Sequence, residues 1–112
     1  MPTQRATQRR IKHSYIVRQK GVCGGKPIIA GTRIRVSQIA TYYEKMGYQP
    51  DDIVRMHPQL TLAQVHDALS YYYDHIEEID RQIAEERRLI EEMKQGYVSV
   101  LEQKDGGNSH LR

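Results

Sequence analysis

Apolar residues recur at alternating spacings of three and four over residues 62–97, and only Glu86 interrupts the series. This period of 3.5 residues is typical of helices whose apolar seam packs against another helix, as in coiled coils. The members of the series are Leu62, Val65, Leu69, Tyr72, Ile76, Ile79, Ile83, Ile90, Met93 and Tyr97. The pattern predicts one helix from Thr61 to Gln95, which would be about 50 Å long.

A helix of this length exceeds what one domain in a chain of 112 residues needs. We therefore expect its second half to project and to bury its seam on another chain, either a second copy or a partner protein. The residues that we assign to this interface are Tyr72, Ile76, Ile79, Ile83, Ile90 and Met93.

Local signals define the start of this helix and predict two shorter helices before it. Thr61 and Gln64 have the spacing of a capping box, and Leu60 and Val65 that of a hydrophobic staple. Pro50 suits the first position of a short helix that must end near Met56, before His57-Pro58. An earlier helical stripe runs through Val36, Ile39, Ala40 and Tyr43, with Ser37 as the expected N-cap and Gly47 as the expected end.

The N-terminal third predicts extended structure rather than helix. Residues 11–19 alternate as a weak strand, and the Gly-rich segment after them predicts short strands at Ile28–Ile29 and at residues 33–36, joined by a turn at Ala30-Gly31. We therefore expect a mainly α fold, in which a small N-terminal β-hairpin precedes a three-helix, helix-turn-helix core with a long C-terminal helix. Residues 1–10 are expected to form a disordered basic arm, residues 11–96 the domain, and residues 97–112 a tail.

The net charge of +3 hides a sharp division between the two parts of the chain. Residues 1–43 contain nine Lys and Arg and no acidic residue, whereas residues 44–112 contain eight Lys and Arg and all 14 acidic residues, which gives 8 − 14 = −6. A basic N-terminal part favours a polyanionic partner, although it is also compatible with a solvated surface or an acidic protein partner.

Several functional classes are disfavoured. Gly25-Lys26 lacks the earlier Gly and the following Ser or Thr of a phosphate loop, and no base can be assigned to Cys23 as a nucleophile. The spacing of the five His residues predicts no metal site. We expect no enzymatic activity and no cofactor. The single cysteine, and the lack of a signal peptide or a sufficiently long apolar run, favour a cytoplasmic protein without a membrane span.

DNA is the polyanion that a helix-turn-helix arrangement favours. The helix that begins after Thr61 would be the recognition helix, although Asp67 lies in its first two turns and no Lys or Arg follows before Arg81. Most of the affinity would then come from basic residues outside this helix. The candidate DNA-binding residues are Arg9, Arg10, Lys12, Lys26, Arg33, Arg35, Thr61, Gln64 and His66.

The segment from Val22 to Val36, VCGGKPIIAGTRIRV, resembles the opening signature of the domain-of-unknown-function family 433, roughly gGKPxIxGTRIxV. Gly47, Pro50-Asp51-Asp52-Ile53 and Pro58-Gln59-Leu60-Thr61 match later parts of its pattern, so that the resemblance covers about residues 14–79. The residues that match the opening signature most directly are Gly25, Lys26, Pro27, Gly31, Thr32 and Arg33.

The resemblance implies a homeodomain-like helix-turn-helix fold and an antitoxin of a bacterial toxin–antitoxin pair, whose partner is a PIN-like ribonuclease. It implies no catalytic residues. The leading hypothesis is thus a homodimeric, DNA-binding antitoxin that neutralises such a toxin and represses its own operon. The alternative is a protein–protein adaptor without DNA binding. The extension after Ile79 departs from the short family core and could be the toxin-binding element.

Overall fold

The computed structural model describes the backbone of residues 12–109 and the side chains of residues 12–96. The described part of the chain begins with two short antiparallel strands. β1 (Ile16–Val17) pairs with β2 (Ile28–Ile29), and a 3-10 turn, η1 (Cys23–Gly25), lies in the loop between them. The strand predicted at residues 33–36 is wrong: only an isolated bridge joins Arg35 to Ile28, because the next helix already begins at Val36. The predicted arm, residues 1–10, lies outside the described residues.

The first helix begins slightly earlier than its predicted N-cap and changes its winding midway. α2 (Val36–Ala40) continues directly into a π-helical segment, η2 (Thr41–Lys45). Gly47 follows it with a φ of +76°, a conformation that favours glycine and fits the predicted end. The N-cap is Arg35 and not Ser37, which is fully buried inside α2.

α3 (Pro50–Met56) and α4 (Leu62–Asp74) begin where the sequence predicts. The predicted capping box is present: the Thr61 hydroxyl accepts a hydrogen bond from the Gln64 amide at 3.2 Å, and the Gln64 side chain accepts one from the Thr61 amide at 2.8 Å. Leu60, at the predicted staple position, is buried. α3 and α4 thus form the helix-turn-helix pair.

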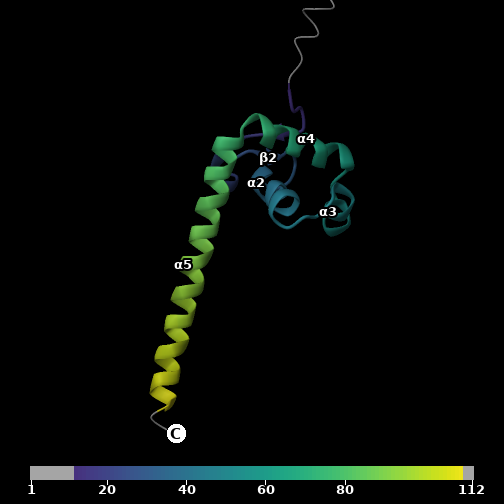
Figure 1. Cartoon of the computed structure of the whole chain (residues 1–112). Coiled ribbons are helices and arrows are strands. Elements are labelled where there is room, and N and C mark those ends of the chain that lie inside the picture. Colours follow the sequence, from purple (N-terminus) through teal and green to yellow (C-terminus); the bar gives the residue numbers. More distant parts are fainter. Residues whose placement is uncertain (1–11, 110–112) are drawn as a thin grey trace, which may run out of the picture.

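The single long helix predicted from Thr61 to Gln95 is in fact two helices. His75 leaves helical geometry, with φ −136° and ψ 44°, and α5 (Ile76–Ser109) departs from it in a new direction (Figure 1). Glu77 and Glu78 favour this new helix start through the helix dipole. The predicted helix end before Gly96 is also wrong, because α5 continues through this glycine into the predicted tail, as far as Ser109.

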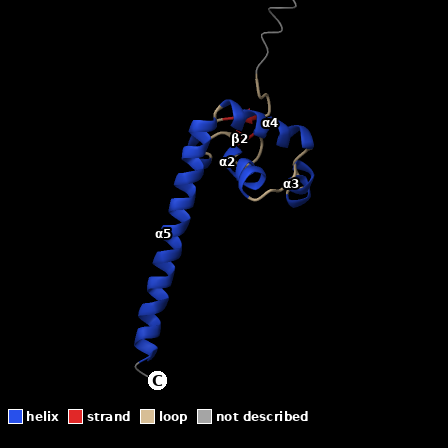
Figure 2. Cartoon of the chain, in the orientation of Figure 1, coloured by secondary structure: helices blue, strands red, loops and turns tan. Residues whose placement is uncertain are grey.

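The core lies where α2, α4 and the first turns of α5 meet, beside the two strands (Figure 2). The seam supplies Val65, Leu69, Tyr72, Ile79 and Ile83 to it. Beyond this region α5 leaves the domain, which gives the molecule extents of 82 × 28 × 23 Å. Over residues 12–109, no helix is both long and apolar enough to cross a membrane.

Candidate functional site

Glu86, the residue that interrupts the seam, connects α5 to the N-terminal part of the domain through hydrogen bonds and ion pairs. Its carboxylate accepts hydrogen bonds from the Ser37 hydroxyl at 2.9 and 3.1 Å and from Arg35 Nε at 3.1 Å, and Lys26 Nζ lies 3.3 Å away. The Glu86 side chain is 18% exposed. A part-buried carboxylate is stable here because three donors compensate for its lost hydration. We call these four residues the Glu86 cluster.

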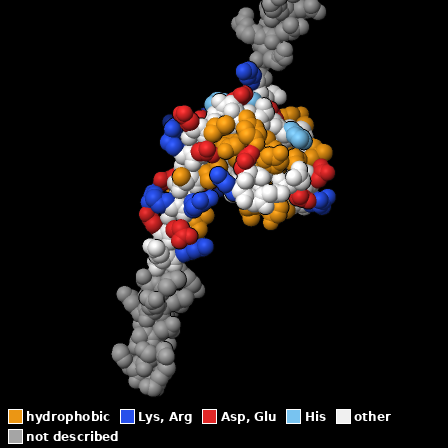
Figure 3. Space-filling view, in the orientation of Figure 1, with side chains coloured by type: hydrophobic (Ala, Val, Ile, Leu, Met, Phe, Trp, Pro, Cys, Tyr) orange, Lys and Arg blue, Asp and Glu red, His pale blue; other side chains and the backbone are white. Residues whose placement is uncertain are grey.

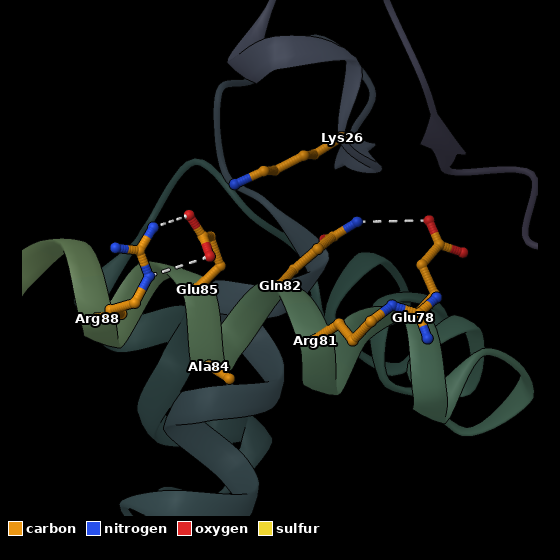
Figure 4. A pocket seen from close by; sticks show the side chains of 7 residues that line it. All are labelled: Lys26, Glu78, Arg81, Gln82, Ala84, Glu85 and Arg88. Atoms are coloured by element: carbon orange, nitrogen blue, oxygen red, sulfur yellow. Dashed lines mark hydrogen bonds and ion pairs between the residues drawn. The ribbon is translucent and has the colours of Figure 1, made fainter.

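Lys26 reaches this cluster from the loop between the strands and crosses over α5 (Figure 4). Below it lies a shallow pocket of about 480 Å³, lined also by Glu78, Gln82, Glu85 and Arg88. Arg88 pairs with Glu85, and Gln82 donates to Glu78 at 3.4 Å, so the charged residues of this pocket largely satisfy one another. Among the described residues, Gln82 Oε1 is a buried oxygen without a hydrogen-bond partner.

A second hollow lies on the other side of α5, in the angle between this helix and the α2–η2 segment. We call it the α5 groove; its volume is about 370 Å³. Ile83, Ile90 and the Tyr42 ring contribute apolar surface. The rim is charged. The remaining lining residues are Arg35, Gln38, Thr41, Glu86, Arg87, Glu91 and Lys94.

The predicted partner interface divides into a covered and a free part. Tyr72, Ile79 and Ile83 are buried in the chain's own core, at 7% exposure or less. Ile76, Ile90 and Met93 are exposed at 42%, 53% and 72%, and Leu89, outside the predicted set, is exposed at 42%. Apart from Ile76, the free part of the interface therefore lies beyond Glu86, where charged residues of both signs surround it along α5 (Figure 3).

The N-terminal segment is held against the outer side of α4. His13 Nε2 lies 2.7 Å from Asp74, and its Nδ1 lies 3.4 Å from Asp67, whose carboxylate also accepts the Tyr15 amide at 2.8 Å. Nearby, Arg18 donates to the Tyr71 hydroxyl at 2.9 Å and to Glu78. The bond to Glu78 raises the pKa of the Arg18 guanidinium. The Asp67 carboxylate is thus occupied by contacts within the chain, with His13 and the Tyr15 amide.

The candidate DNA-binding residues differ in their surroundings. Lys26 and Arg35 belong to the Glu86 cluster, and Thr61 and Gln64 bond the backbone at the start of α4. Lys12, Arg33 and His66 are exposed. Arg9 and Arg10 lie outside the described residues. Over residues 12–109, no group of three or more His, Cys, Asp or Glu side chains is arranged to hold a metal ion.

Sequence reasoning found the exposed seam residues but missed the Glu86 cluster and the α5 groove. One signal was available: a lone carboxylate at a seam position requires a compensating donor, and the only basic segment without acids lies upstream. The groove had no such signal, because it depends on the direction of α5 after His75.

The fold and these surfaces define a class: a small helix-turn-helix protein whose last helix projects from the domain. The model of the family described as protein of unknown function (DUF433) matches residues 16–72, about half of the chain. The chain therefore belongs to the DUF433 family. The match ends at Tyr72, so that Glu86 and most of the α5 groove lie outside it.

A solved structure agrees with this assignment. The crystal structure of a DUF433 member protein from Anabaena variabilis is similar to this chain, with 31% sequence identity and a TM-score of 0.59. The similarity covers 74% of this chain and 79% of the other. No curated protein sequence matches the chain.

Proposed function

We propose that this chain is a non-enzymatic, antitoxin-like protein that binds a partner protein through the free part of α5. The observation that carries the proposal is the exposed apolar surface of Leu89, Ile90 and Met93, on a helix that extends well beyond the core. Contiguous apolar surface on a projecting helix is costly in water and is a common feature of protein interfaces. Following the family resemblance, the proposed partner is a PIN-like ribonuclease toxin.

The test begins with the reading frame adjacent to the gene, where we expect a PIN-like ribonuclease. Coexpressed with this chain, the ribonuclease should copurify with it and lose its activity on RNA. The variant Ile90→Asp/Met93→Asp should bind the ribonuclease at least about tenfold more weakly, because it places charges at the centre of the interface. The matched control is Ala84→Asp/Gln95→Asp, which adds two acidic residues at exposed positions of α5 outside this apolar surface. Equal binding by the variant and the wild-type chain would contradict the proposal.

Repression of the operon through DNA binding is a second candidate function. Arg33 and Lys12 favour it, since both are exposed and neither forms an ion pair within residues 12–109. Phosphate contacts of this kind depend strongly on salt. In a titration with promoter DNA, we expect binding at low salt that weakens as salt increases, and Arg33→Ala should reduce the salt dependence by about one contact. Absence of binding even at low salt would leave the protein-binding function alone.

A further inference from the structure

The chemistry of the α5 groove restricts what can occupy it, if the proposed binding of a partner protein is correct. Along the groove, the exposed Ile90 continues the line of the buried Ile83 towards the C-terminal end of α5. Met93, one helical turn after Ile90, prolongs this surface and is 72% exposed. An occupant that follows α5 therefore needs an apolar side of its own.

The charges of the rim favour an acidic occupant. Glu86 is already compensated by the donors of its cluster. Arg87 and Lys94 both line the groove, and they lie on the same side of α5 because seven residues are 20° short of two full turns. Neither forms an ion pair within the described residues, and Glu91 is the one acidic residue beside them in the groove lining apart from Glu86.

A second copy in parallel orientation does not fit this side of α5. The domain lies on the same side as the exposed seam, since Ile83 is buried in the core and Ile90 follows it in the groove (Figure 1). Two parallel helices pack at axial separations of about 8–10 Å. Both domains would then have to occupy the narrow space between the helices at the same height.

A second copy in antiparallel orientation meets a different obstacle. In such a pair, each edge of a seam faces the same edge of the other helix. The edge that carries Arg87 and Lys94 would therefore face the same two cations of the second copy. Like charges at close range are destabilising. A nucleic acid would match these two cations, but it would leave Ile90 and Met93 without apolar contacts.

We propose that the α5 groove binds a helix of a different protein, with apolar residues along one side and Asp or Glu along the edge that faces Arg87 and Lys94. The apolar residues would continue the core beyond Ile83, and the acidic residues would make charge-assisted bonds to the rim. This assigns the partner's chemistry, whereas the net acidity of α5 alone would suggest a cationic partner.

The test uses two fluorescein-labelled peptides of roughly three heptads, with Leu at the seam positions. One carries Glu at both flanking positions and its twin carries Lys there. In fluorescence anisotropy with the full chain at physiological salt, the Glu peptide should bind at least about tenfold more tightly. The variant Arg87→Glu/Lys94→Glu should invert the preference. The control Arg81→Glu/Arg88→Glu makes the same charge change on the side of α5 that lines the pocket below Lys26. This control should keep the preference for the Glu peptide.

Several results would overturn the proposal. These are equal affinity for both peptides, no binding of the Glu peptide up to about 1 mM, or an unchanged preference in Arg87→Glu/Lys94→Glu. Displacement of the Glu peptide by a single-stranded oligonucleotide would assign the groove to nucleic acid. A dimer in sedimentation equilibrium that Ile90→Asp dissociates would assign it to a second copy. If the ribonuclease still binds through Ile90 and Met93 while the peptides fail, the proposed function stands and the inference on charge falls.

Discussion

The Ser37 hydroxyl donates to the Glu86 carboxylate at 2.9 Å, although 49 residues separate the two in the chain. Ser37 is fully buried at the start of α2, and Glu86 lies at the point where α5 leaves the domain. With Lys26 and Arg35, this bond connects the basic signature segment to a helix outside the matched family region. Part of the basic N-terminal charge therefore has an internal structural role.

The first prediction concerns this connection. Glu86→Ala should lower the free energy of unfolding by about 1–3 kcal/mol, because it leaves the buried Ser37 hydroxyl and two cations without their acceptor. Urea unfolding followed by circular dichroism measures the change. Glu91→Ala, at an exposed position of the same helix, is the control and should change stability by less than about 0.5 kcal/mol. A Glu86→Ala variant as stable as the control would show that the cluster contributes little.

The second prediction separates the covered from the free part of the seam. Ile83→Ala should cost about 2–4 kcal/mol, because Ile83 is 7% exposed and its loss leaves a cavity in the core. Ile90→Ala should change stability by about 0.5 kcal/mol or less, since Ile90 is 53% exposed. The same urea experiment compares the two variants. Similar losses for both would mean that Ile90 is covered in solution, for instance by a second copy.

The third prediction concerns pH. Burial and the hydrogen bond to Asp80 raise the pKa of Tyr72 to about 12, so that the folded state favours the neutral phenol. The resulting stabilisation is complete below pH 10, the ordinary value, and is lost as the pH rises towards 12. The stability of Tyr72→Phe, compared at about pH 9 and about pH 11, should therefore fall less steeply than that of the wild-type chain. Identical slopes would contradict this assignment.

Absorbance titration offers an independent measurement of the same effect. Tyr73 also has a pKa raised to about 12, mainly by its hydrogen bond to Glu44. Tyr72 and Tyr73 should therefore ionise later than ordinary tyrosine, and Tyr72→Phe should remove one of these two late steps. Loss of both late steps in the single variant would indicate that the two sites are not independent.

The fourth prediction concerns the start of α4. Thr61→Ala should lower stability by about 1 kcal/mol, because it removes the acceptor of the Gln64 amide. Thr61→Ser keeps the acceptor and should restore most of the loss. If the chain binds DNA, promoter affinity measured where all variants are folded should change little, since the Thr61 side chain is engaged by the backbone. A large loss of DNA affinity without a loss of stability would instead indicate that Thr61 contacts the bases.

Local signals predicted much of the fold. Pro50 and the Thr61–Gln64 capping box fixed two helix starts correctly, because they satisfy backbone groups within one turn. The break at His75 could not be predicted in this way. The seam keeps its spacing through Tyr72, Ile76 and Ile79, and no Gly or Pro marks the break. It depends on tertiary packing, which draws Ile79 and Ile83 into the core and leaves Ile76 exposed.

The candidate site also contains residues whose roles could be predicted from the sequence and residues whose roles could not. The exposed residues Ile90 and Met93 could be predicted from spacing and length alone. The roles of Lys26 and Arg35 could not, because a count of charges does not reveal that Glu86 lies between them. The presumed reading residues Thr61 and Gln64 also carried two interpretations in the sequence, a cap and a base contact, and the structure places both side chains in the cap.

The position of the Glu86 cluster along α5 makes this helix a lever arm. The helix continues from Glu86 to Ser109 for roughly 35 Å at 1.5 Å per residue. A tilt of about 10° at the cluster would therefore sweep the far end through roughly 6 Å. The direction of the projecting helix thus depends on the contacts near its pivot, which include the Glu86 cluster and the packing of Ile83 in the core. Small rearrangements in the signature segment would be magnified at the far end of the helix.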